Sequence, residues 1–155
     1  MEDISEYFDK VLNFLSFRAR SEYEIDFYML RKGWTEEIKE IIKNKLKQLK
    51  LIDDEDFARQ WISSRSNSRP AGKSQIKFEL TKKGIDREII NKLLAEERTS
   101  TTEKLLAEKL CRKKLERLKN LPLGEKREKL FGLLSRRGFS SETAVETIDK
   151  LFKKE

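Results

Sequence analysis

Apolar residues recur at intervals of three and four through most of the chain, which is the spacing of one face of an α-helix. The first segment places six apolar residues on such a stripe: Ile4, Tyr7, Phe8, Val11, Leu12 and Leu15. The fourth segment loses the pattern after Ile62, and the polar residues 63–69 are expected to leave the helix. Polar residues 96–102 are expected to form a connector before a long helix over 103–120.

Three junctions between predicted helices share one order of residues. An apolar residue closes a helix, two basic residues occupy its last turn, Gly reverses the chain, a second apolar residue follows, and Thr, Asp or Ser begins the next helix. Basic residues complement the helix dipole, Gly suits a left-handed C-cap, and Ser, Thr and Asp are preferred N-caps. The three segments are residues 29–35, 80–86 and 134–140, centred on Gly33, Gly84 and Gly138.

The regular spacing of these glycines indicates an internal repeat, with three predicted helices in each interval. We therefore expect an all-α fold of tandem three-helix units that form an elongated, curved array, because stacked repeats bury their faces on their neighbours. The expected units are residues 1–52, 53–98 and 99–155. Phe14 and Phe78 lie off the main stripes of their helices, as such stacking would require.

Composition excludes several classes of protein. Charged residues make up 41% of the chain and the net charge is +7, which favours a polyanionic partner or, alternatively, a solvated surface rich in ion pairs. A single cysteine, Cys111, lies on a helical stripe and is expected in the core. The acidic start of the chain is unlike a signal peptide, and no apolar run reaches membrane-spanning length, so a cytoplasmic location is expected.

The chemistry of an enzyme is missing from the pattern. The chain has no His, and its many carboxylates do not accompany a nucleophile or a glycine-rich turn. Gly72-Lys73-Ser74 resembles the end of a phosphate-binding loop, but Asn67 stands where that loop needs another Gly and the preceding segment is helical. We expect no enzymatic activity, no cofactor and no metal site, and we interpret the acidic residues 53–56 as a helix start.

Taken in order, several segments resemble the bacterial RecX family. The resemblance is densest over residues 51–85, from Leu51-Ile52-Asp53-Asp54 through Phe57-Ala58-Arg59-Gln60-Trp61-Ile62 to Lys83-Gly84-Ile85. Residues 15–22 and 134–140 extend it to most of the chain. The resemblance implies a tandem three-helix array that binds the RecA recombinase filament on DNA and inhibits its ATP hydrolysis and strand exchange in recombination and repair.

The basic residues are the candidates for binding RecA or DNA. Most belong to the middle repeat, where Arg59 should face solvent or a partner and Arg65 falls on the apolar side, where it could bind directly, snorkel or pair with an acid. A second patch combines an aromatic ring with basic neighbours near the end of the first helix. The full set is Arg59, Arg65, Arg69, Lys73, Lys77, Phe17, Arg18 and Arg20.

Other interpretations of the same residues remain open. Basic residues at the helix ends are explained by the helix dipole alone, and Phe57 with Trp61 suits a core better than base stacking. A helical array that binds DNA or RNA without RecA is the main alternative, and an architectural adaptor that binds neither is another. The chain is expected to act as a monomer.

Overall fold

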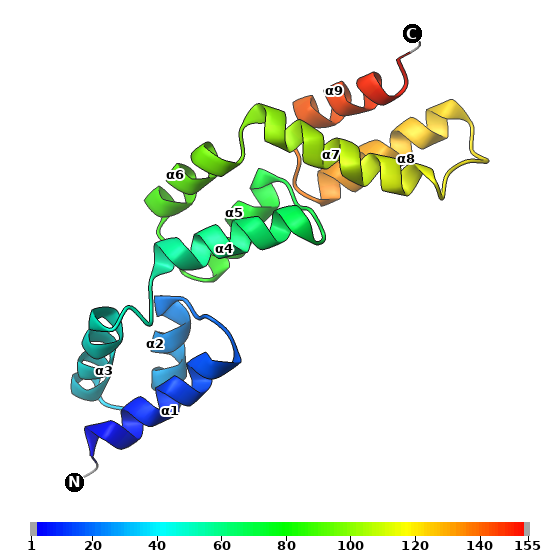
Figure 1. Cartoon of the computed structure of the whole chain (residues 1–155). Coiled ribbons are helices and arrows are strands. Elements are labelled where there is room, and N and C mark those ends of the chain that lie inside the picture. Colours follow the sequence, from blue (N-terminus) through cyan, green and yellow to red (C-terminus); the bar gives the residue numbers. More distant parts are fainter. Residues whose placement is uncertain (1–2, 154–155) are drawn as a thin grey trace.

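The computed structural model describes residues 3–153, which form nine α-helices and no strand. Met1 and Glu2, part of the acidic start noted above, lie outside the described residues. The helices follow one another along an elongated molecule with the termini at opposite ends (Figure 1). They are α1 (Ile4–Phe17), α2 (Glu22–Arg31), α3 (Glu36–Gln48), α4 (Asp54–Asn67), α5 (Lys73–Lys82), α6 (Arg87–Glu97), α7 (Ser100–Leu115), α8 (Leu123–Arg136) and α9 (Ser141–Leu151).

Each group of three helices packs around its own apolar core. One core lies among α1 to α3 and includes Val11 and Ile25, a second among α4 to α6 includes Ile62 and Leu80, and a third lies among α7 to α9. Cys111 is fully buried in the third core, as predicted. We refer to the three groups as repeats 1, 2 and 3; the expected boundaries at 52/53 and 98/99 stay predictions.

The glycine junctions adopt the conformation that the sequence predicted. Gly33, Gly84 and Gly138 have φ values of 75°, 75° and 86°, in the left-handed region that residues with a Cβ avoid. At each junction the amide of the apolar residue after Gly donates to a carbonyl five residues earlier, as Ile85 N does to Leu80 O at 3.1 Å. The next helix then begins on a side-chain cap, at Thr35, Asp86 or Ser140.

The structure corrects three of the predicted element ends. Helix α4 does not stop at Ile62 but continues to Asn67, and the long helix predicted over 103–120 spans Ser100–Leu115. The connector expected over 96–102 is reduced to Arg98 and Thr99. Polar residues extend these helices because helix propensity is weak compared with tertiary packing, and Arg98 is itself fully buried.

Repeat 2 joins repeat 1 at the first turn of α2. The Ser21 hydroxyl donates to the carbonyl of Lys83 at 2.6 Å, and the Glu22 amide donates to Asp54 Oδ1 at 2.8 Å. The Lys83 ammonium lies 3.4 Å from a carboxylate oxygen of Glu24. The C-terminal end of α5 therefore meets the N-terminal end of α2, an arrangement in which the helix dipoles attract.

Repeat 3 joins repeat 2 in the same way, at the first turn of α5. The Gly72 amide donates to the carbonyl of Arg137 at 2.7 Å, and the Ser74 amide donates to that of Gly138 at 3.2 Å. The Lys73 amide donates to Glu103 Oε2 at 3.3 Å, which parallels the bond between Glu22 and Asp54. We call each junction centred on Gly33, Gly84 or Gly138 a glycine hairpin. Each joint is thus formed by the glycine hairpin of one repeat and the start of a helix in the repeat before it.

Candidate nucleic-acid interface

Two of the basic residues selected from the sequence are engaged within the molecule. Arg59 lies between three carboxylates, with guanidinium to oxygen distances of 3.2 Å to Glu55, 3.5 Å to Glu96 and 3.2 Å to Glu97. Arg65 pairs with Glu79 at 3.1 Å, which is the acid pairing left open for it. Charges neutralised inside the fold contribute little attraction for a polyanion, although both residues stay candidates for contacting a protein.

Three more of the selected residues are exposed cations. Lys73 and Lys77 project from α5, and Arg69 lies in the connection from α4 to α5 with a left-handed φ of 52°. None of the three side chains forms an ion pair within residues 3–153. These are the members of the predicted set whose charge is available to a ligand.

The aromatic patch at the end of α1 is built differently from the prediction. Phe17 is 76% exposed, whereas Phe14 stacks on Tyr28 with ring centroids 4.3 Å apart. The guanidinium of Arg20 lies 3.9 Å from the centre of the Phe14 ring, and burial together with the charge of Arg18 lowers the pKa of Arg20. Arg18 itself pairs with Glu24. Phe17 is therefore the exposed aromatic residue of this patch, and its role as a contact stays a prediction.

A groove lined by basic residues lies between repeats 2 and 3. The groove, of about 600 Å³, separates the connection from α4 to α5 from helices α7 and α8. Its floor includes Leu110 and Leu133, and no carboxylate lines it. We call it the basic groove, and its six basic residues are Arg69, Lys109, Lys113, Lys114, Arg117 and Arg137.

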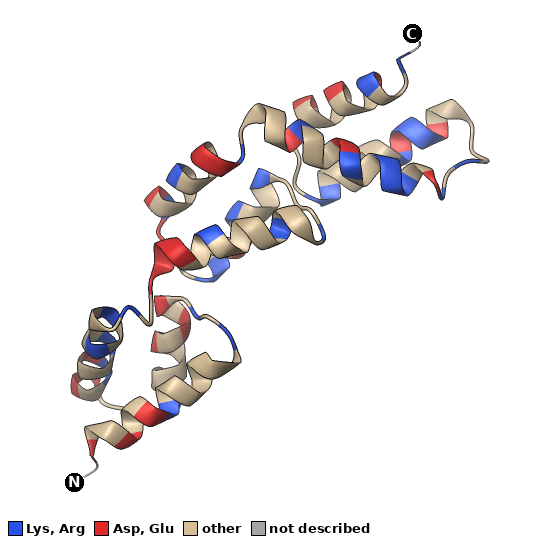
Figure 2. Ribbon diagram, viewed as in Figure 1, with Lys and Arg blue, Asp and Glu red and all other residues tan. Residues whose placement is uncertain are grey.

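The basic groove follows from helical spacing on α7. Lys109, Lys113 and Arg117 stand four residues apart, so they line one face of α7 and the turn after it. Figure 2 shows this concentration of basic residues along the C-terminal half of α7. Arg69 and Arg137 close the groove from the other side, where Arg137 Nη1 donates to the carbonyl of Pro70 at 3.2 Å.

A buried arginine fixes the wall of the basic groove. Arg98 is fully buried and donates to the carbonyls of Arg65, at 3.3 Å, and Ala71, at 2.7 Å, on either side of the segment that carries Arg69. Its charge is balanced by Glu103 at 2.7 Å, and Ser66 Oγ accepts two further bonds. The orientation of Arg69 toward repeat 3 therefore depends on the short connection between α6 and α7.

The groove can bind a polyanion because its charge is uncompensated. None of its six cations forms an ion pair within the described residues, in contrast to Arg59 and Arg65. Cations that neutralise backbone phosphates release counterions, which is the main source of affinity for nucleic acids. The side chains of Asn67 and Ser68, which also line the groove, can hydrogen-bond to phosphate oxygens.

One of the six groove residues, Arg69, was predicted from the sequence. The spacing of Lys109, Lys113 and Arg117 was visible in the sequence as a basic stripe, and it could have identified their common face. Arg137 was attributed to the helix dipole, and its proximity to the connection before α5 depends on how repeat 3 docks. The groove is therefore a property of the joint between two repeats.

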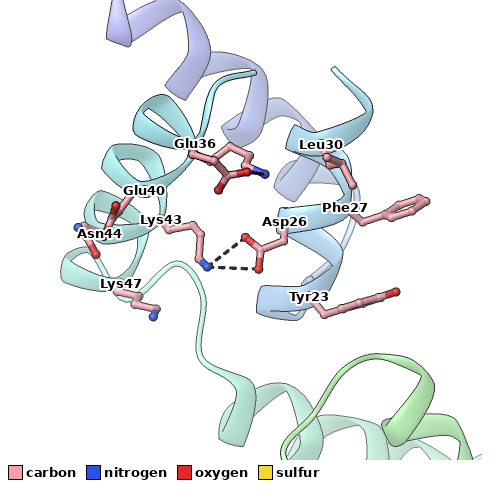
Figure 3. Close-up of a pocket in the computed structure, with 10 residues that line it drawn as sticks. Tyr23, Asp26, Phe27, Leu30, Glu36, Glu40, Lys43, Asn44 and Lys47 are labelled. Atoms are coloured by element: carbon pink, nitrogen blue, oxygen red, sulfur yellow. Dashed lines mark hydrogen bonds and ion pairs between the residues drawn. The ribbon is translucent and has the colours of Figure 1, made fainter. Parts of the chain in front are cut away.

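A second groove lies in repeat 1, between α2 and α3, and its chemistry differs. It has a volume of about 670 Å³, and its charges are largely paired. Lys43 lies 3.1 Å from Asp26 and 3.2 Å from Glu22, and Lys39 pairs with Glu36. Figure 3 shows Lys43 directed at Asp26, while Tyr23 and Phe27 project away from α3. Balanced charge makes this groove a weaker candidate for a polyanion.

The fold and the basic groove together define a class of protein, a tandem helical-repeat protein with a basic groove between two of its repeats. Comparison with known families places it more closely. Residues 8–47, 53–94 and 106–154 match the models described as the first, second and third three-helix domains of RecX. The chain belongs to the RecX family, whose members are non-enzymatic regulators.

Similar proteins extend over most of the chain. Proteins named regulatory protein RecX are 36% identical in Mycolicibacterium smegmatis, over 88% of this chain and 74% of the relative, and 38% identical in Chlorobium limicola, over 91% and 86%. A crystal structure of RecX from Lactobacillus salivarius superposes with a TM-score of 0.85 at 28% identity and covers 96% of both chains. The resemblance inferred from the sequence is confirmed.

No helix within residues 3–153 is both long enough and apolar enough to cross a membrane.

Proposed function

We propose that this protein regulates the RecA recombinase by binding RecA filaments on DNA, and that it inhibits their ATP hydrolysis and strand exchange during recombination and repair. Membership of the RecX family supports the regulatory role. The observation that carries the DNA part of the proposal is the basic groove, with six cations and no carboxylate. The protein contacts the phosphate backbone through the groove and leaves other surfaces for the recombinase.

The elongated shape supports a target that is itself extended. The three repeats are arranged along one direction (Figure 1), so different repeats can contact successive positions of a filament. Phe17 lies in repeat 1 and the exposed lysines of α5 lie in repeat 2, and both stay our candidates for contacting the recombinase. To contact a partner, Arg59 and Arg65 would have to break their ion pairs within the fold and form new ones with carboxylates of that partner.

The test is a titration of RecA ATPase on single-stranded DNA, in which the protein should suppress turnover below one molecule per RecA subunit. The variant Lys109→Glu/Lys113→Glu should be a weaker inhibitor because it reverses charge in the basic groove. A matched control is Lys10→Glu/Lys129→Glu, which makes the same change of charge on exposed residues that neither line the groove nor belong to the predicted binding set. No effect of the unmodified protein on ATP turnover or strand exchange at equal concentrations would contradict the proposal.

Measuring the binding of DNA in the absence of RecA distinguishes the proposed function from the main alternative, a helical array that binds nucleic acid without RecA. Affinity for single-stranded DNA should fall with salt, with a slope of about 0.7 per phosphate neutralised, and the slope should decrease by about one or more in Lys109→Glu/Lys113→Glu. A protein that binds DNA in this way but leaves RecA turnover unchanged would be a stand-alone nucleic-acid-binding array. Binding that is absent or independent of salt would refute the assignment of the groove.

A further inference from the structure

Two of the three glycine hairpins are covered by a neighbouring repeat, and the third is open. A Cβ added to Gly84 would overlap the side chain of Tyr23, and one added to Gly138 would overlap Gln75. A Cβ added to Gly33 meets nothing within 4 Å. The backbone conformations agree, with φ of 75° at both Gly33 and Gly84. The Gly33 hairpin therefore has the same backbone conformation as the two covered hairpins, but no helix start within residues 3–153 packs against it. We call a helix start that packs on a hairpin its occupant.

The two covered hairpins show what this element binds. In both, the occupant is the first turn of a helix, and the carbonyl at the end of the hairpin's helix accepts a hydrogen bond from the residue that caps the occupant. Lys83 O accepts from the Ser21 hydroxyl, and Arg137 O accepts from the Gly72 amide. Opposed helix ends attract because the partial charges of the two dipoles have opposite signs.

The first joint adds an ion pair to this pattern. Lys83, the C-cap residue of α5, lies 3.4 Å from Glu24 at the third position of α2. Lys32 occupies the equivalent position at the end of α2. It is exposed and forms no ion pair within the described residues; its ammonium lies 5.5 Å from the centre of the Tyr28 ring. An occupant of the Gly33 hairpin with an acidic residue at its third helical position would complete the same pair.

We propose that the hairpin formed by Arg31, Lys32 and Gly33 is a docking site for the first turn of a helix in a partner protein. The docked helix has Ser, Thr or Gly as its cap and an acidic residue at its third position. The inference rests on the proposed function, because the partner is taken to be the recombinase filament. Repeat 1 then docks on the partner through the contact that joins the repeats to one another.

A second copy of this chain fits the hairpin less well. Its corresponding free helix start is that of α8, which begins after Pro122 and has no side-chain cap. Proline lacks an amide hydrogen, so it cannot supply the bond that Gly72 gives to Arg137. A different protein is therefore the occupant.

The variant Gly33→Asn tests the proposal with little effect on the fold. Asn tolerates the left-handed conformation, and its side chain has open space in the free protein, but it would overlap a docked helix as a Cβ does at Gly84. The matched control is Gly124→Asn, because a Cβ at Gly124 also meets nothing within 4 Å and belongs to α8. Circular dichroism and thermal unfolding establish that both variants are folded.

Affinity is measured for RecA assembled on single-stranded DNA and, separately, for the same DNA without RecA. Gly33→Asn should bind the filament roughly tenfold or more weakly, since a lost hydrogen bond and a steric overlap together exceed about 1.4 kcal/mol. Its affinity for naked DNA should be unchanged, and Gly124→Asn should bind both like the unmodified protein. Lys32→Glu should weaken filament binding, while Lys32→Arg should retain it.

The outcomes separate this inference from the proposed function. Filament binding by the unmodified protein that Gly33→Asn and Lys32→Glu leave unchanged would overturn the docking site alone. Absence of filament binding by the unmodified protein would overturn the proposed function and the docking site together. Self-association that Gly33→Asn abolishes, measured by sedimentation, would show a second copy as the occupant and would also overturn it.

Discussion

Replacing Arg98 with Met should destabilise repeats 2 and 3 more than the loss of any surface charge. Arg98 is fully buried and donates five hydrogen bonds, to Ser66, Ala71, Arg65 and Glu103. The substitution leaves the Glu103 carboxylate buried without its partner, since that side chain is only 6% exposed. Breaking a buried pair from one side costs roughly 3–5 kcal/mol, a large part of the roughly 5–15 kcal/mol that stabilises a typical domain.

The assay is urea unfolding followed by circular dichroism, applied to Arg98→Met, to Glu103→Gln and to the double variant. Arg98→Met/Glu103→Gln should be more stable than Arg98→Met alone, because no unpaired charge is then buried. The matched surface control is Lys104→Met, which removes the exposed pair with Glu146 and should cost about 1 kcal/mol or less. A cost of that size for Arg98→Met, or a double variant no more stable than it, would refute the assignment of Arg98 as the buried residue that fixes the wall of the basic groove.

Three further predictions follow from single positions. Gly84→Ala should lower the free energy of unfolding by about 1–3 kcal/mol, and with it the midpoint of thermal unfolding, because this position needs a positive φ and the added Cβ overlaps Tyr23 of α2. An unchanged midpoint would contradict the contact between Gly84 and α2. Burial, aided by the charge of Glu108, raises the pKa of Cys111 to about 11, so Ellman's reagent should modify it at pH 8 only after urea unfolding. Burial opposes ionisation of Glu24, but the bonds from Arg18 and the Ser21 amide, together with the charges of Arg18 and Lys83, outweigh burial and lower its pKa. The stability that Glu24 adds over Glu24→Gln should therefore be present above the ordinary glutamate pKa of about 4.3 and vanish as the pH falls through the lowered value; a difference that persists in acid would contradict it.

The helices and their hairpins were predictable because local chemistry determines them. The apolar stripe of α1, the left-handed glycines and the caps at Thr35, Asp86 and Ser140 each depend on residues within one or two turns. A Gly after a basic helix end reverses the chain whatever surrounds it. The repeat, the all-α class and the family could therefore be inferred from the sequence before any contact between repeats was known.

The helix ends that were predicted wrongly depend on distant residues. Polar residues 63–67 extend α4 and end in a segment held by Arg98, whose carbonyl partners lie about thirty residues earlier in the chain. Arg98 was assigned to a polar connector because an arginine between helices is usually solvated. Its burial requires Glu103 and two carbonyls to converge on one point, and sequence spacing does not show that convergence.

The charge of the chain was likewise known from the sequence, but its distribution between free and paired residues was decided by the tertiary structure. Arg59 and Arg69 are the same residue type ten positions apart. One lies between carboxylates of α4 and α6, and the other opens on the basic groove. Electrostatic pairing depends on distances across the fold, so the packing of helices within repeat 2 and the docking of repeat 3 separate the cations available to a phosphate from those already neutralised.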